Sequence, residues 1–480
     1  LRLMKDSGVK PPDGGYGWVV VASAFTAMGL TAAVLKNFGL FFLDIQRSFG
    51  VLTSTTSWVT SIAIAMFHLG APGASVLSMR FSQRAVIMVG GCLSALGMVL
   101  ASLGLSLPWI YLTMGLLQGL GISLSWISAN SMVSHYFSRW RSIAYAIASS
   151  GECIFAIAFS PLFQWFIDTF TWQGALLLIG GLQLNLCVCG ALMRPLKHPL
   201  TRSRSRSPAL DTTDVPELGD SDVCEQEEVK LNFQWSLLKK REMELYILFA
   251  VFAAVGFFIL PLYLVPYASS LGLEPYWATS LLSVMALGDL MGRLTCGFLA
   301  NARLIRNLQL LVVVVTLLGV VQLLLPTARS YAALLVFSSF SGLLFGGIVA
   351  IHVTSIIDVV GVDAFDSGLG LFMLLRSTGG FIGPPAAGWL VDRFGDFSSS
   401  FYLSGVCFIV SGIFVVLVDL LLQRKKAAGR EQGLNPELHG CPSTKGDTGG
   451  LCNSGPNSSS EVVVSPGNAA DLGRKGMYSA

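Results

Sequence analysis

The sequence predicts an all-α polytopic membrane protein with twelve transmembrane helices, arranged as two six-helix pseudo-repeats. The 480-residue chain is 53% hydrophobic and only 12% charged, and this charged fraction is about half of that in soluble domains. Long apolar stretches recur along most of the length, as they do in proteins that cross a bilayer many times. Short patterns from the first half also return at corresponding positions in the second half.

Twelve apolar segments are long enough to be membrane spans. At a rise of about 1.5 Å per residue, a helix of about 20 residues crosses the ~30 Å hydrocarbon core of a bilayer. We predict the spans at residues 17–43, 56–79, 85–106, 109–132, 142–166, 172–193, 243–268, 276–300, 306–326, 331–357, 366–391 and 398–422.

Polar segments divide the chain into five parts. A loop at 194–242, which holds an RSRSRS run and an acidic stretch, separates a six-helix bundle at 17–193 from a second one at 243–422. Residues 1–16 form a short N-terminal segment, and the Gly/Ser/Asn-rich tail at 423–480 is predicted to be disordered. Lys and Arg gather in the loops on one side of the predicted membrane, which places both termini in the cytosol.

Two internal patterns support the pseudo-repeat. The motif WxTS occurs in the second span at 58–61 and in the eighth span at 277–280. A longer pattern, P…W…DxF, occurs at 161–170 and at 385–394 with identical spacing. Parallel repeats around a site near the bilayer midplane are typical of secondary transporters that work by alternating access.

A charged pair lies inside the eighth span. Asp289 and Arg293 are four residues apart, so both side chains lie on one helix face. Charges at bilayer depth are costly and are retained chiefly where they face water, a partner or a cargo. A guanidinium matches a carboxylate with two parallel hydrogen bonds, and a neighbouring aspartate can take up a proton when a second anion competes for the arginine. The pair predicts proton-coupled anion binding, with a static ion pair as the alternative.

A second candidate pair follows from the longer repeat. Glu152 in the fifth span corresponds to Arg376 in the eleventh, because each precedes its proline by nine residues. Both side chains should lie near mid-bilayer. They could form a gate pair across the interface between the halves, made in one access state and broken in the other. A permanent structural pair is an equally good interpretation.

Two further ionisable residues fall in predicted spans. Lys36 lies late in the first span, where a lysine ordinarily extends to the membrane interface. His352 in the tenth span is more typical of a hydrogen-bonded core histidine than of a proton relay. The candidate residues in the spans comprise three cations, Lys36, Arg293 and Arg376, and two carboxylates, Glu152 and Asp289. Their surplus positive charge suits a monoanionic cargo.

Motifs of enzymes are missing from the sequence. It contains no HExxH, no GxSxG and no GxxxxGK[ST], so we predict no enzyme activity and no cofactor or metal. The net charge of +3 is spread over tails and loops and gives no sign of a nucleic-acid partner. The expected partners are the lipid bilayer and a small organic anion with its proton.

Two motifs make the chain resemble the monocarboxylate transporter family of the major facilitator superfamily. The first opens the first span and consists of Asp13, Gly14, Gly15, Tyr16, Gly17 and Trp18. The second follows the fourth span and includes Tyr136, Phe137, Arg139 and Arg141. The resemblance covers all twelve spans, roughly residues 12–424.

The resemblance implies a major facilitator fold in the plasma membrane and proton-coupled movement of lactate, pyruvate or ketone bodies. Asp289 and Arg293 fall on the pair that handles the proton and the carboxylate in the best-studied members. Lys36 falls where those members carry a functional lysine, which would attract the anion near the outer mouth. The resemblance also allows a single-span immunoglobulin-type glycoprotein as a partner.

The chain departs from the proton-coupled members at three positions. Val353 stands where they carry a Phe that limits the substrate, which would leave a roomier pocket. They also have a neutral residue at Glu152 and an acidic one at Arg376. The stretch at 149–161 is most similar to the branch linked to ketone-body export and to taurine.

Two alternatives to proton symport of monocarboxylates therefore stay open. One is a proton-independent facilitator of a bulkier or zwitterionic solute, such as an amino acid, taurine or creatine. The other is a metabolite sensor that transports nothing.

Overall fold

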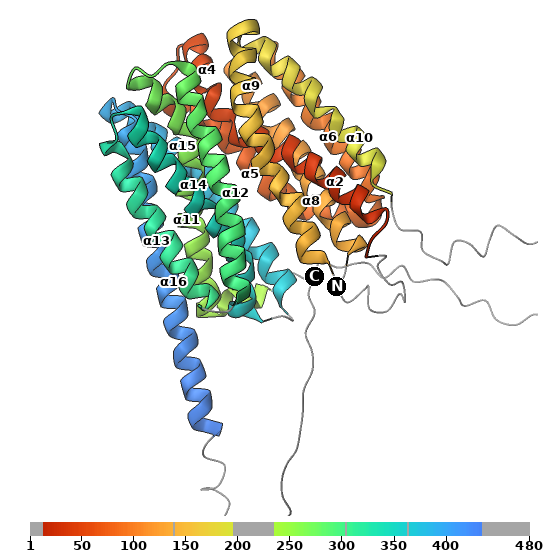
Figure 1. The fold of residues 1–480 in the computed structure, drawn as a ribbon, viewed down its shortest axis with the longest axis vertical. Helices are drawn as coiled ribbons and strands as arrows, with labels where there is room; N and C mark the ends of the chain where they lie inside the picture. Colours follow the sequence, from red (N-terminus) through yellow and green to blue (C-terminus); the bar gives the residue numbers. More distant parts are fainter. Residues whose placement is uncertain (1–12, 138–139, 195–234, 303–304, 362–363, 434–480) are drawn as a thin grey trace, which may run out of the picture. The chain divides into compact units, whose positions relative to one another are not determined.

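The structure is a computed structural model that describes residues 13–137, 140–194, 235–302, 305–361 and 364–433 (Figure 1). Every regular element within these ranges is a helix. The chain divides into two compact units, Leu1–Lys426 and Ala427–Ala480. The site and the interface described below belong to the first unit.

Two spans of the first half are not continuous α-helices. π-helical turns interrupt the first span at Gly29–Ala33 and the fourth span at Tyr111–Leu117. The α-helices of this half are α2 (Gly17–Met28), α3 (Val34–Lys36), α4 (Phe42–Phe49), α5 (Thr53–Arg80), α6 (Gln83–Ala101), α7 (Leu107–Ile110), α8 (Gln118–Tyr136), α9 (Arg141–Gln183) and α10 (Asn185–Leu192).

The second half consists of six long helices. They are α11 (Arg241–Ser270), α12 (Pro275–Ala302), α13 (Asn307–Leu324), α14 (Tyr331–Val360), α15 (Phe365–Phe394) and α16 (Ser398–Gly433). In Figure 1 this half, green to blue, lies beside the first half, red to yellow. Helix α16 continues past residue 422, where the last span was predicted to end.

The predicted twelve-span organisation is confirmed. Ten helical segments in the described residues are long and apolar enough to cross a membrane. One of them, Ile143–Leu192, joins the fifth and sixth predicted spans, and the chain turns between these spans at Thr171, whose φ is 63°. Helix α15 holds the eleventh span.

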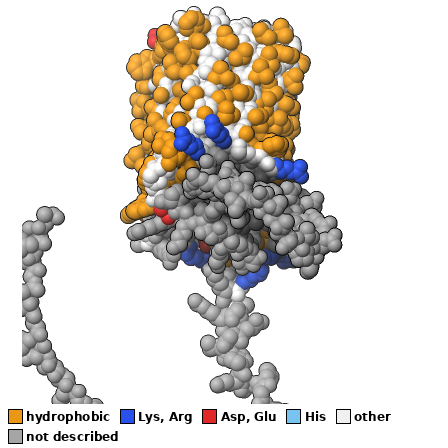
Figure 2. Space-filling view, turned by 90° about the vertical axis from the view of Figure 1, so that its right-hand side faces the viewer, with side chains coloured by type: hydrophobic (Ala, Val, Ile, Leu, Met, Phe, Trp, Pro, Cys, Tyr) orange, Lys and Arg blue, Asp and Glu red, His pale blue; other side chains and the backbone are white. Residues whose placement is uncertain are grey.

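The outer surface of the bundle matches a membrane environment. Figure 2 shows apolar side chains over the lateral face, and Lys and Arg gathered below them at one end. Large apolar side chains are exposed in both halves, such as Val89 and Leu96 in the first and Val313 in the second. Such an extensive apolar surface is expected against lipid and not against water.

Glycines bring the eighth span, α12, close to α14. A side chain at Gly292 would overlap the backbone of Leu343, and one at Gly346 would overlap the backbone of Asp289. Small residues at such contacts allow membrane helices to approach closely. The backbone that carries the Asp289–Arg293 pair is therefore fixed by packing.

The two halves bond to each other at one end of the bundle. The carboxylate of Asp392, near the end of α15, accepts hydrogen bonds from the backbone N–H groups of Thr53 and Ser54 at the start of α5, each at 2.8 Å. One turn further along α5, the hydroxyls of Ser57 and Tyr263 lie 2.5 Å apart. We call the Asp392 carboxylate and the two N–H groups the end contact.

Contacts between the halves continue from this end to the middle of the bundle along α9 and α12. The Thr279 hydroxyl donates to Gln164 Oε1 at 3.1 Å, and the Ser283 hydroxyl donates to the carbonyl of Ile157 at 3.1 Å. Further along the same two helices lie the charged residues described next, which also join the halves. An alternating-access fold that is closed at one end has contacts of this kind.

Candidate functional site

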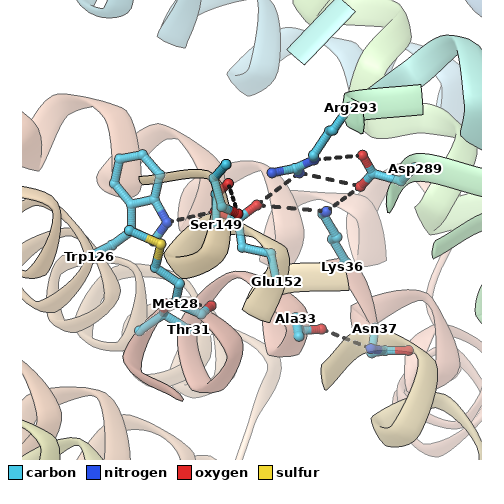
Figure 3. Close-up of polar contacts among 11 residues, drawn as sticks. Met28, Thr31, Ala33, Lys36, Asn37, Trp126, Ser149, Glu152, Asp289 and Arg293 are labelled. Atoms are coloured by element: carbon cyan, nitrogen blue, oxygen red, sulfur yellow. Dashed lines mark hydrogen bonds and ion pairs between the residues drawn. The ribbon is translucent and has the colours of Figure 1, made fainter. Parts of the chain in front are cut away.

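Four charged side chains meet midway along the interface between the halves (Figure 3). They are Lys36 from α3, Glu152 from α9, and Asp289 and Arg293 from α12, and we call them the charge cluster. Lys36 Nζ lies 2.8 Å from Asp289 Oδ2 and 3.9 Å from Glu152 Oε2. Each half therefore supplies one cation and one carboxylate.

Arg293 bonds to carboxylates from both halves. Its Nε donates to Asp289 Oδ1 at 2.8 Å, and its Nη2 donates to Asp289 Oδ2 at 3.3 Å. The same Nη2 donates to Glu152 Oε2 at 2.9 Å. The i, i+4 pairing expected from the sequence is present, and Glu152 joins it from the other half.

A break in the first span places Lys36 in the cluster. Helix α3 ends at Lys36, and Asn37 leaves helical geometry with φ −92° and ψ 6°. The Asn37 amide donates to the carbonyl of Ala33 at 2.8 Å, and its Oδ1 accepts from the Ser160 hydroxyl at 2.7 Å. The break follows the π-helical turn at Gly29–Ala33, a feature often found at functional sites. Lys36 does not extend to the membrane interface, so that interpretation was wrong.

Glu152 is held by a partner that the sequence did not indicate. Trp126 Nε1 donates to Glu152 Oε1 at 2.9 Å, while Oε2 accepts from Arg293. The Glu152 side chain is only 9% exposed. A single tryptophan in an apolar span carries no sequence signal for such a role, because most aromatic residues in spans only pack.

The charge cluster is electrically neutral. Its two cations and two carboxylates alternate, so that each charge has an opposite charge beside it. Removing one member of such a buried group leaves an unpaired charge and typically costs about 3–5 kcal/mol. A cargo that enters the cluster must therefore replace the contacts that it breaks.

The predicted pair between Glu152 and Arg376 is not formed in this conformation. Arg293 and Trp126 occupy both oxygens of Glu152. The guanidinium carbon of Arg376 instead lies 5.0 Å from the centroid of the Phe257 ring. A permanent structural pair is thereby excluded. Internal repeats identify equivalent positions in the two halves, but equivalent positions need not face each other.

Val353 lies away from the cavities of the site. Phe345, on the same helix, lines both cavities found beside Lys36. Val353 lies further along α14, about 12 Å away by helical rise, and lines neither cavity. In this conformation Phe345 takes the position that we expected Val353 to have, and the roomier pocket stays a prediction.

His352 is a buried core histidine. Its Nδ1 donates to the carbonyl of Ile348 at 2.8 Å, and the Tyr246 hydroxyl donates to its carbonyl at 2.5 Å. The ring stacks on Phe372 with centroids 5.7 Å apart.

Two narrow cavities adjoin the charge cluster. The first, with an empty volume of about 340 Å³, is lined by Lys36, Asp289, Asn37, Ser160 and Phe345 among others. The second, of about 360 Å³, shares Lys36 and Phe345 and is otherwise lined mainly by apolar residues such as Phe257. Apolar walls with a few charged groups are typical of binding sites for small organic ions.

The two family motifs pack against each other at one end of the first half, away from the charge cluster. The Asp13 N–H donates to the carbonyl of Tyr136 at 3.2 Å. The rings of Trp18 and Phe137 have centroids 5.2 Å apart, and a side chain at Gly17 would lie 2.9 Å from the Phe137 ring. Contacts between segments so distant in sequence indicate a structural role for these motifs.

Tyrosines from both motifs also fasten the end of the sixth span. Tyr16 donates to the carbonyl of Leu192 at 2.6 Å, and Tyr136 donates to the carbonyl of Arg194 at 2.5 Å. Of the remaining motif residues, Arg139 lies outside the described residues, as does the side chain of Arg141.

The fold and the site define a secondary transporter. A family model described as the Major Facilitator Superfamily matches residues 19–327 and 305–445. The chain belongs to this superfamily.

Several relatives show that, within the superfamily, the chain belongs to the monocarboxylate transporter family. Human monocarboxylate transporter 2 is 35% identical over 426 residues, covering 88% of this chain and 89% of that protein. Mouse monocarboxylate transporter 12 is 35% identical, and the matched region covers 88% of this chain and 90% of that protein. Rat monocarboxylate transporter 13 is 36% identical, and the matched region covers 91% of this chain and 96% of that protein.

Two solved structures show the same fold at low identity. A bacterial homolog to the human lysosomal transporter Spinster, in its inward-facing conformation, matches with a TM-score of 0.61 at 15% identity over 86% of this chain and 97% of its own. A mutant of the nucleoside transporter NupG matches with a TM-score of 0.62 at 12% identity, over 85% of this chain and 99% of its own.

Proposed function

We propose that this protein moves small organic monocarboxylates across the plasma membrane together with a proton, by alternating access. The observation that carries this proposal is the neutral charge cluster, in which Arg293 and Lys36 are held by two carboxylates at the interface between the halves. The named activity of the relatives, monocarboxylate transport, supports the choice of cargo.

The coupling follows from competition for the two cations. A cargo carboxylate that binds the Nε and Nη2 edge of Arg293 displaces Asp289 or Glu152, because these carboxylates already accept hydrogen bonds from that edge. The displaced carboxylate loses its counter-charge in a buried setting and becomes neutral by taking up a proton. Cargo and proton then cross as a pair, and the cluster stays neutral throughout.

The proposed orientation places the end contact outside the cell. Lys and Arg are concentrated at the opposite end of the spans, and such residues favour the cytosolic side. The described conformation would then be closed to the outside, and both termini would lie in the cytosol.

A second candidate function is supported by Glu152. A second carboxylate in the cluster offers a partner for an ammonium group, while Lys36 or Arg293 binds the acidic group of the same solute. Proton-independent facilitation of a zwitterion, such as an amino acid or taurine, would use this arrangement. The retained pair of Asp289 and Arg293 favours the first proposal.

Uptake of radiolabelled β-hydroxybutyrate into oocytes expressing the protein tests the first proposal. Uptake should be saturable, should rise when the external medium is made acidic, and should be unaffected by excess taurine. Uptake that does not change with pH and is inhibited by taurine would support proton-independent facilitation of a zwitterion instead. Absence of any uptake despite surface expression would contradict both.

A further inference from the structure

Arg376 differs from the members of the charge cluster because none of the described residues supplies it with a counter-charge. Lys36 lies 2.8 Å from a carboxylate oxygen, and Arg293 lies 2.9 Å from one. In the described part of the chain, by contrast, no carboxylate lies within ion-pair distance of Arg376, and its guanidinium donates no hydrogen bond. The surplus positive charge of the spans therefore resides on Arg376.

A pair of stacked rings separates Arg376 from the charge cluster. The guanidinium lies over Phe257 at 5.0 Å from the ring centroid. Phe257 stacks on Phe345 with centroids 3.7 Å apart and planes inclined by 22°, and Lys36 Nζ lies 5.8 Å from the Phe345 centroid. Arg376 and Lys36 thus lie at opposite ends of an aromatic stack, and both rings line the second cavity.

The groups that face Arg376 do not neutralise it. His68 of α5 and His352 of α14 interact with it electrostatically, and each histidine donates its Nδ1–H to a carbonyl of its own helix. Tyr246 of α11 also interacts with it electrostatically, and its hydroxyl is engaged with the carbonyl of His352. An uncompensated guanidinium in such surroundings is costly, and it is retained chiefly where it meets a partner or a cargo.

We propose that Arg376 is a second anion-binding residue, which holds the carboxylate or other oxyanion head of the cargo on the far side of the Phe257–Phe345 stack from the charge cluster. The inference rests on the proposed function. The free, planar fork of donors on Arg376 can bind an oxyanion with two parallel hydrogen bonds. The donors of Arg293 that face the cluster, by contrast, are already occupied.

The proposal also assigns a role to the aromatic stack. In this proposal the stacked rings of Phe257 and Phe345 separate an anion bound at Arg376 from Lys36. The two rings belong to α11 and α14 of the same half, so they form a partition that lies within the second half. Arg376 would then hold the cargo before or after its contact with the cluster.

Kinetics of the full-length protein in proteoliposomes test the proposal, with radiolabelled β-hydroxybutyrate as the probe. Arg376→Gln should raise KM about tenfold or more with little change in the maximal rate, because it removes a charged hydrogen-bond donor from binding. Arg376→Lys should raise KM less, since a lysine keeps the charge but loses the fork. Arg329→Gln, at an exposed arginine of the same half, is the matched control and should leave KM unchanged.

The outcomes separate this inference from the proposed function. Absence of saturable uptake by the wild-type protein would contradict the proposed function itself. Wild-type uptake together with an unchanged KM in Arg376→Gln would overturn the inference alone, and Arg376→Lys serves the same comparison if the glutamine variant does not fold. Restoration of the wild-type KM by the combined exchange Glu152→Arg and Arg376→Glu would also overturn it, because the two residues would then pair in the other access state.

Discussion

The charge cluster and the end contact join the same two halves with different chemistry. In the cluster, side chains of both signs bond to each other, as Arg293 does with Glu152 at 2.9 Å. In the end contact, one carboxylate, Asp392, accepts from two backbone N–H groups at the start of α5, each at 2.8 Å. A carboxylate at a helix N-terminus satisfies unpaired donors and interacts favourably with the helix dipole.

The difference indicates a division of roles. Partners in the charge cluster can be exchanged for a cargo carboxylate or a proton, so the cluster can respond to the solute. Backbone N–H groups neither titrate nor leave the helix, so the end contact responds to closure of the halves at that end and not to the cargo. We therefore expect changes in the cluster to alter the chemistry of transport, and changes in the end contact to alter the population of conformations.

The largest effect is expected from Arg293→Ala. The substitution removes the donor for the cargo and leaves Asp289 and Glu152 without their shared cation. Uptake of β-hydroxybutyrate should fall by about a hundredfold or more, as when one partner of a buried charge pair is deleted. Surface biotinylation is the control, because the protein should still reach the membrane. Near-normal uptake at normal surface density would contradict a role for Arg293 in binding the cargo.

Asp289→Asn should separate transport from the proton. An amide keeps the shape of the carboxylate but carries no charge and takes up no proton. Uptake should drop by about tenfold at acidic external pH, and the residual flux should no longer respond to pH. The measurement is uptake over a series of external pH values, with Asp289→Glu as the matched variant. A normal pH response in Asp289→Asn would contradict the proposed role.

Asp392→Ala should shift the conformational equilibrium without changing coupling. It removes an acceptor for Thr53 and Ser54, and losing such a helix cap costs about 0.5–2 kcal/mol. The closed-end conformation should lose population by roughly twofold to thirtyfold, which spin-label distances across the ends of α5 and α15 would report. The pH response of uptake should be retained. A variant that loses its pH response instead would show that the two contacts are not separate in function.

The smallest effect is expected at Val353. Because this residue lines neither cavity, Val353→Phe should change KM for β-hydroxybutyrate by less than about twofold, as is usual away from a binding site. Phe345→Leu, which enlarges both cavities, is the informative comparison and should improve uptake of longer-chain monocarboxylates. A strong loss of uptake in Val353→Phe alone would restore Val353 as the residue that limits cargo size.

Features that depend on neighbouring residues in the sequence were predicted better than contacts between distant residues. The spans were predicted well because hydropathy is a local property, although the break at Asn37 was not foreseen, since its cause includes a bond to Ser160 of α9. The contact between Asp289 and Arg293 was predictable because helical geometry sets the i, i+4 distance. The partner of Glu152 was not, because symmetry between repeats relates positions and not contacts.

The sequence by itself therefore determined the membrane class, the two six-helix halves, the family and the charged residues at bilayer depth. Only the tertiary structure decided how those charges combine. Lys36 pairs with Asp289 across the interface, and Glu152 accepts a hydrogen bond from Arg293. Arg376 lies above the ring of Phe257. The physical reason is that a charge at bilayer depth is costly until an opposite charge or a cargo meets it. Which distant residue supplies it depends on how the helices of the two halves pack.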